Sequence, residues 1–135
     1  MTEFRISEAA ALLGVSDDTV RRWGDSGRLR IRKDGAHQTV EGGDLVPLVQ
    51  ELAAESALAE AFPPAKASAR NRFTGLVTAV TKDGVMAQVD LQAGPFRVVS
   101  LMSREAADEL GLAPGMLATA SVKATNVVVE VSQES

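Results

Sequence analysis

The sequence predicts an α+β protein of two small domains, a helical one at the N-terminus and a five-stranded, partly open OB-like β-barrel at the C-terminus. Three observations lead to this expectation. Apolar residues recur at helical spacing as far as residue 60, and they alternate with polar residues from Phe73 onward. Residues 61–67 contain two consecutive prolines, which end a helix and favour an extended path. We therefore expect domains at residues 1–60 and 68–135, joined by a linker at 61–67.

Composition excludes several classes of function. The 135 residues include no cysteine, no tyrosine and one histidine, and the net charge is −4. Disulfide scaffolds, thiolate metal sites and cysteine nucleophiles are therefore excluded, and without clustered carboxylates we expect no enzyme. Nothing resembles a signal peptide or an apolar run near twenty residues, so we expect a cytoplasmic protein without membrane association.

Capping residues divide the N-terminal part into helices. Ser7 and Gly14 bound a first short helix, and Ser16 caps a second helix that Gly27 ends. A third helix is expected from about Asp44 toward residue 60, with a buried stripe of leucines and valines. Two short helices around a tight turn, the second carrying arginines, are typical of a helix-turn-helix, whose second helix can enter the major groove.

The net negative charge of the chain does not favour DNA binding, but the charge around the second helix does. Between Asp18 and Lys33 there are six basic residues and two acidic ones. Such a patch can contact phosphates, although a solvated mixed face is the alternative interpretation.

A family resemblance adds to this pattern. Four stretches resemble the winged helix of excisionases and MerR-type regulators: Ser7-Glu8-Ala9-Ala10, Leu13-Gly14-Val15-Ser16, Thr19-Val20-Arg21-Arg22-Trp23 and Gly27-Arg28-Leu29. The resemblance implies that the second helix reads DNA and that a following β-ribbon, the wing, contacts its backbone. Carried over by position, the DNA contacts are Thr19, Arg21 and Arg22 in the groove, Arg28, Arg30, Arg32 and Lys33 along the wing, and His37 at its tip. The tip lacks two basic residues that relatives often carry there, so we expect low affinity for DNA.

The C-terminal part has the periodicity of strands. Alternating runs at 73–80, 85–91, 96–102, 116–123 and 126–131 predict five strands, and a short helix from Ser103 to Leu110 precedes the fourth. This order fits a barrel of OB type.

Two short runs suit an anion, one at the start of the first strand of this barrel and one between its last two strands. Ser68 to Gly75 and Val122 to Thr125 each join a cation to a hydroxyl or amide at a strand edge. A guanidinium fork, an ammonium and hydroxyl donors can hold a tetrahedral dianion without any metal ligand from the protein. Ordinary solvated charges at strand edges are the alternative interpretation.

The same runs resemble a molbindin, or Mop, domain of the TOBE superfamily. The sequence of the expected short helix, Glu105-Ala106-Ala107-Asp108-Glu109-Leu110-Gly111-Leu112, resembles it too. The resemblance implies a barrel that forms trimers or hexamers, here a hexamer built as a trimer of dimers, and that binds molybdate or tungstate at subunit interfaces. The residues it implies as oxyanion contacts are Ser68, Arg70, Lys123 and Thr125, with backbone N–H groups near Asn71 and Ala124 and the hydroxyl of Ser103.

Together these features predict a molybdate- or tungstate-responsive transcriptional regulator that binds DNA through its N-terminal domain. One alternative is a storage or buffering oligomer whose winged helix serves assembly. A second alternative is a DNA-binding protein whose barrel only oligomerises.

Overall fold

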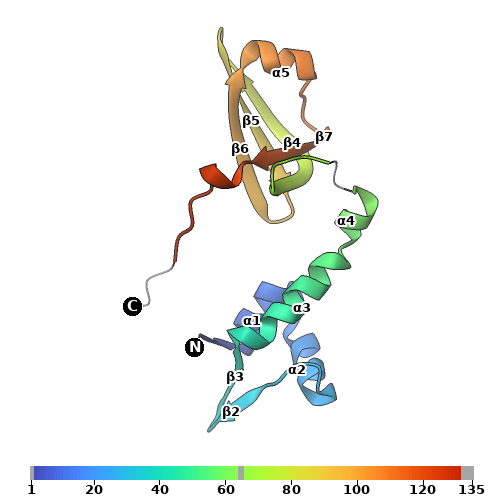
Figure 1. The fold of residues 1–135 in the computed structure, drawn as a ribbon, viewed down its shortest axis with the longest axis vertical. Helices are drawn as coiled ribbons and strands as arrows, with labels where there is room; N and C mark the ends of the chain where they lie inside the picture. Colours follow the sequence, from blue (N-terminus) through green and yellow to red (C-terminus); the bar gives the residue numbers. More distant parts are fainter. Residues whose placement is uncertain (1, 64–65, 132–135) are drawn as a thin grey trace. The chain divides into compact units, whose positions relative to one another are not determined.

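The computed structural model describes residues 2–63 and 66–131 (Figure 1). The chain divides into two compact units, Met1–Pro64 and Ala65–Ser135. Both combine helices and strands, in agreement with the predicted α+β class. Within the described residues, no helix has the length and hydrophobicity needed to cross a bilayer.

Three strands and three helices account for most of the first unit, in which a fourth, short helix follows. In chain order the elements are β1 (Glu3–Arg5), α1 (Ile6–Leu13), α2 (Asp17–Ser26), β2 (Arg32–Asp34), β3 (His37–Glu41), α3 (Gly42–Ala54) and α4 (Ala57–Ala61). The strands form an antiparallel sheet in the order β1-β3-β2, so β2 and β3 are a hairpin.

The turn between α1 and α2 forms as the sequence predicts. Gly14 adopts a left-handed conformation (φ 73°) that ends α1, and the Ser16 hydroxyl accepts a hydrogen bond from the Thr19 N–H at 3.1 Å. The core of this unit combines all three longer helices with β3 and the loop before β2. Its buried members are Ile6, Ala9, Ala10, Leu13, Val20, Leu29, Val40, Leu45 and Leu48.

Two boundaries differ from expectation. Arg5, not Ser7, is the N-cap of α1, because the Glu8 carboxylate accepts a hydrogen bond from the Arg5 N–H at 2.9 Å. The expected third helix is divided in two, because Ser56 caps a new helix, α4, with its hydroxyl.

The second unit is one curled antiparallel sheet with a helix at one end (Figure 1). Its elements are β4 (Asn71–Lys82), β5 (Met86–Ala93), β6 (Phe96–Ser103), α5 (Arg104–Leu110), β7 (Leu117–Val122) and a 3-10 turn, η1 (Ala124–Asn126). The strand order is β6-β5-β4-β7. Val77, Val89 and Leu91 form the buried core of the concave face.

The predicted fifth strand is wrong for the single chain. After Val122, η1 turns the backbone away from the sheet, with the Asn126 N–H bonded to the Lys123 carbonyl at 2.9 Å. Residues 127–131 form no strand, and Val128, Val129 and Val131 are 83%, 83% and 87% exposed. Alternating valines give a segment strand propensity, but a strand needs a neighbour with which to pair. The described chain therefore has a four-stranded sheet in place of the expected five-stranded barrel.

Candidate anion-binding site

The first residue of β4 and the last residue of β7 lie opposite each other. Asn71 pairs with Val122 in the antiparallel register, and the Asn71 side-chain amide donates to the Val122 carbonyl at 3.1 Å. Arg70 immediately precedes β4 and Lys123 immediately follows β7. The two predicted cations therefore flank one end of the same strand pair, although they are 53 positions apart in the sequence (123 − 70).

This end of the sheet carries positive charge that no ion pair within residues 66–131 neutralises. Among the ion pairs of residues 66–131, none involves Arg70, Arg72 or Lys123, and the side chains of Arg70 and Lys123 are exposed. Cations without a carboxylate partner attract an anionic ligand more strongly than cations that are already paired.

Arg72 is a third cation at this end that the sequence reasoning missed. It is half-buried and pairs with Ser121 in the β4–β7 register. The signal was present, because Arg72 stands in the same run, Ser68 to Gly75, as Arg70.

The remaining predicted contacts at this end are exposed. Ser68 lies in the irregular segment before β4, and Ala124 and Thr125 form the start of η1. The first N–H groups of a 3-10 turn have no partner within the turn, so they are available as donors. Two hydroxyls, two or three cations and backbone N–H groups can together surround a small oxyanion.

Ser103 lies elsewhere in the protomer. It ends β6 opposite Met86, near the Lys82 end of β4, whereas the two cations flank the Asn71 end. The 12 residues of β4 run between these ends, a length of at most roughly 36 Å along the strand at about 3.3 Å per residue. Figure 1 likewise shows α5 and η1 at different ends of the sheet. One chain alone does not bring Ser103 to the cations.

A hydrogen-bonded network fixes Ser103 where it is. The Ser103 hydroxyl caps α5 by accepting from the Ala106 N–H at 3.1 Å. The Arg104 N–H donates to the Val85 carbonyl at 2.7 Å, and its guanidinium donates to the Asp83 carbonyl at 3.0 Å. These bonds hold the start of α5 against the β4–β5 turn. The Ser103 hydroxyl hydrogen is still free to donate to a ligand.

Two carboxylates of this network are acidified. Hydrogen bonds from the N–H groups of Met86 and then Val85 lower the pKa of Asp83 from its ordinary value. A hydrogen bond from Lys82 is the main cause of the lowered pKa of Asp108, and Arg104 adds to the effect. Both carboxylates therefore stay ionised around neutral pH and hold the turn and α5 together.

Of four predicted DNA contacts on the wing, two form ion pairs within the unit and two do not. Arg28 bonds to Glu51 at 3.2 Å and lies 4.5 Å from the centre of the Trp23 ring, and Arg32 bonds to Glu41 at 2.8 Å. Arg30 and Lys33, by contrast, take part in none of the ion pairs found in residues 2–63. The wing therefore offers fewer free cations than the sequence suggests.

The exposed side of α2 carries the other predicted contacts. Arg22 donates to the Thr19 hydroxyl at 3.1 Å, and Arg21 forms a long 3.4 Å pair with Asp18. Both ends of that pair are exposed, so solvent screens it and it contributes little. His37 begins β3 at the tip of the hairpin and is exposed. Within the described residues, no group of three or more His, Cys, Asp or Glu side chains could hold a metal ion.

Known proteins resemble the second unit in sequence. The TOBE domain model matches residues 67–129. The chain is 41% identical over 63 residues to molybdenum-pterin-binding protein 3 of Clostridium pasteurianum. The aligned residues make up 46% of this chain and 93% of that protein. This chain is 40% identical over 73 residues to the molybdenum-pterin-binding protein MopA of Rhodobacter capsulatus, which covers 53% of this chain. The chain spans only 28% of the length of MopA.

A solved structure is also similar. A molybdate-binding protein from Sporomusa ovata is 31% identical, with a TM-score of 0.47, and the match covers 50% of this chain and 100% of that one.

Proposed function

Because the chain belongs to the TOBE-domain family of molybdenum-pterin-binding proteins, we propose that its second unit binds molybdate or tungstate and that its first unit binds DNA. The observation that supports the proposal is the pairing of Asn71 with Val122, because Arg70 and Lys123 adjoin these two residues at the same end of the sheet. The protein is then a cytoplasmic, oxyanion-responsive regulator with a binding role and no catalytic one.

The chemistry of the cage favours a large dianion. Molybdate and tungstate carry two negative charges and four acceptor oxygens, and they match a site made of donors only: Arg70, Lys123, hydroxyls and N–H groups. Sulfate has shorter bonds to oxygen, so a rigid cage built for molybdate leaves donors unsatisfied around it. Each buried donor left without a partner costs about 1–3 kcal/mol.

We propose that a second copy of the chain completes each barrel and each site. The concave face of the sheet is an apolar groove of about 460 Å³ lined mainly by β5, β6 and β7, with Val89, Val98, Met102 and Ala120 among its residues. The exposed valines of residues 127–131 are the matching apolar segment. A partner's segment in this groove would restore the fifth strand. The Ser103 hydroxyl would likewise reach the cations from a neighbouring protomer, and a hexamer built as a trimer of dimers is the assembly we expect.

DNA binding by the first unit rests on its shape and charge. The order α1, turn, α2 and hairpin β2–β3 supports a winged helix-turn-helix, in which the half-buried Thr19 and the exposed Arg21 and Arg22 of α2 would face the groove. The two sites can be linked if the oligomer has two arrangements that differ in DNA affinity. An ion that binds one arrangement more tightly then shifts DNA affinity by no more than its difference in binding free energy between the two.

The storage or buffering oligomer remains the second candidate. The observation in its favour is that Arg28 and Arg32 are already paired with Glu51 and Glu41. Fewer free cations mean weaker phosphate binding.

Native mass spectrometry with and without molybdate tests the ligand and the assembly together. We expect an oligomer that retains molybdate, and we expect the double variant Arg70→Gln plus Lys123→Gln to lose the ion. Arg97→Gln is the matched control, because Arg97 lies on the same sheet but pairs with Asp90 at 3.2 Å. Retention of the ion by the double variant would contradict the site.

Fluorescence anisotropy of labelled duplex DNA at two salt concentrations separates regulator from storage protein. A regulator loses affinity steeply as salt rises, because bound cations displace counterions from the phosphates. A chain that shows no salt-sensitive binding is a storage protein.

A further inference from the structure

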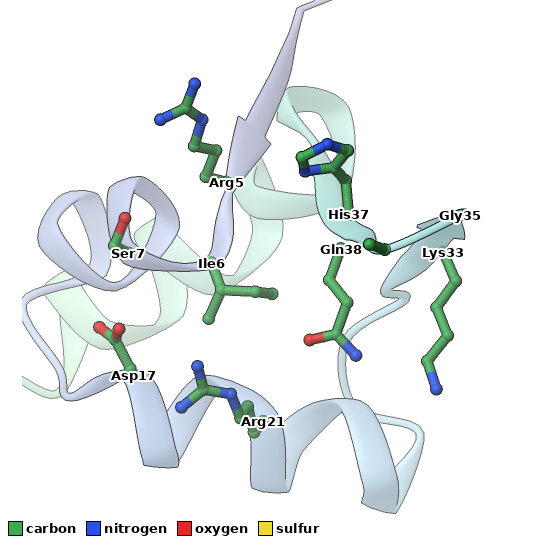
Figure 2. Close-up of a pocket in the computed structure, with 10 residues that line it drawn as sticks. Arg5, Ile6, Ser7, Asp17, Arg21, Lys33, Gly35, His37 and Gln38 are labelled. Atoms are coloured by element: carbon green, nitrogen blue, oxygen red, sulfur yellow. The ribbon is translucent and has the colours of Figure 1, made fainter.

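A hollow of about 450 Å³ lies in the first unit between the start of α1, the helix α2 and the β2–β3 hairpin. Figure 2 shows its lining, with Arg21 rising from α2 below Ile6, and with Lys33 and His37 on the hairpin. Three cations from three separate elements line it, Arg5, Arg21 and Lys33. The cluster therefore arises from the tertiary fold and has no counterpart in sequence spacing.

The lining of the hollow contains fewer acidic side chains than basic ones. Asp17 is the only carboxylate in its lining. Asp18, which pairs with Arg21 across 3.4 Å at an exposed position, and Glu8, which accepts from the Arg5 backbone N–H, both lie outside the lining. The lining itself therefore carries a positive excess, and the imidazole of His37 can add an N–H donor.

Arg5 is the least expected member of this cluster. Its backbone is fixed on one side by Glu8 and on the other by its pairing with Thr39 of β3. Its side chain is exposed, and none of the ion pairs within residues 2–63 involves it. A positioned backbone with a free guanidinium is well suited to a phosphate oxygen, because the fork donates two parallel hydrogen bonds.

The hollow continues along α2. A second hollow of about 260 Å³ shares Arg21, Lys33 and Gln38 with the first and extends to Gly24, Ile31 and the carboxylate of Asp25. Apart from Ile6, Asp17 and Gln38, the residues that line the first hollow are exposed, so it is a shallow surface feature. A polymer whose phosphates repeat along a groove fits this shape better than a small free anion, which would be poorly enclosed.

We propose that this groove holds the sugar-phosphate backbone of one DNA strand and that Arg5, outside α2 and the hairpin, clamps a phosphodiester there. The inference rests on the DNA binding proposed above and names a contact that the family resemblance did not supply. Because the contact is to phosphate, it supplies affinity and register and carries no base preference.

Arg5→Gln tests the clamp in the full-length chain. We expect the slope of log Kd against log salt to fall by about one unit, which makes the affinity loss between about 50 and about 200 mM salt some three- to fourfold smaller than in the parent. The loss should be equal for duplexes of different sequence. Arg5→Lys keeps the charge without the fork, and we expect it to keep the slope but to bind more weakly than the parent.

Arg97→Gln is the matched control, since it removes the same charge from the second unit and should leave the slope unchanged. The emission of Trp23, which packs against the core of the first unit, checks that each variant is folded.

Three results would overturn the clamp, and they are distinguishable. If the parent binds DNA and Arg5→Gln binds with the same slope, the clamp is wrong and the DNA-binding proposal stands. If the parent shows no salt-sensitive DNA binding, both are wrong. If inorganic phosphate at constant ionic strength shifts the NMR signals of Arg5 as DNA does, the hollow is a small-anion site.

Discussion

The side-chain amide of Asn71 donates a hydrogen bond to the Val122 carbonyl across 3.1 Å. The bond joins the start of β4 to the end of β7, and the next residues outward are Arg70 and Lys123. It therefore limits how far the two proposed ligand cations can separate, even though Asn71 itself carries no charge.

Asn71→Ala is expected to weaken molybdate binding without removing a cation. Loss of one neutral hydrogen bond costs about 1 kcal/mol, which corresponds to roughly a fivefold rise in Kd if the loss falls on ligand binding. Isothermal titration calorimetry measures this directly. Thr74→Val is the control, because it removes a 2.9 Å hydroxyl contact with Thr119 between the same two strands, farther from the site. Equal weakening by both variants would show that general sheet stability, and not this end, governs binding.

Gly75→Ala is expected to destabilise the second unit. A Cβ at this position would lie 2.1 Å from the Gln92 carbonyl oxygen and 2.9 Å from the Ala93 Cα, which are backbone atoms that cannot rotate away. Overpacking of this kind costs about 1–3 kcal/mol or more. Gly84→Ala is the matched control, since nothing lies within 4 Å of its Cβ. Urea unfolding followed through NMR amide signals of β5 should separate the two, and equal stability would contradict the close approach.

Local signals in the sequence predicted most elements but not their partners. Gly14 and Ser16 act through neighbouring backbone groups, so the α1–α2 turn could be predicted from a few residues. Residues 127–131 have strand propensity, but whether a strand forms depends on a pairing partner, either a distant segment of the same chain or a segment of another chain. Propensity therefore placed a strand there that the single chain does not form.

The candidate sites show the same division. The position of Arg70 and Lys123 at strand ends could be predicted because each stands at the edge of a recognisable strand, whereas their role as ligand contacts stays a prediction. That Glu51 and Glu41 engage Arg28 and Arg32 could not be predicted, because each of these pairs depends on how the segments fold against each other. The grouping of Arg5 with Arg21 and Lys33 likewise exists only in the folded unit.

Acid should weaken the second unit through Asp83 and Asp108. The folded state lowers the pKa of both carboxyls below the ordinary value of 3.8, so their contribution to stability is present above about pH 4 and is lost as pH falls through the lowered folded values. Asp83→Asn should therefore be less stable than the parent at pH 6, and the difference should shrink toward pH 2. Urea unfolding across this range measures it.

Glu109→Gln is the control for this pH dependence. Glu109 lies beside Asp108 on α5 but forms no ion pair within the described residues, so its replacement should leave the acid slope unchanged. The difference in unfolding free energy between Asp83→Asn and the parent should not be the same at every pH. A constant difference would contradict the assignment, because the contribution of the ionised Asp83 carboxylate must vanish once this group is protonated in both the folded and the unfolded state.

Closure of the barrel by a partner predicts a specific weakness in residues 127–131. Val128→Asp plus Val129→Asp places charge on both faces of the segment, so one charge must enter the apolar groove whichever face points inward. Loss of one buried valine alone removes about 2 kcal/mol of burial, so association should weaken at least tenfold in analytical ultracentrifugation. Val85→Asp is the control, because Val85 is 72% exposed in the β4–β5 turn, away from the groove. If the segment instead returned to its own groove, the double variant would lose stability as a monomer without any dependence on protein concentration.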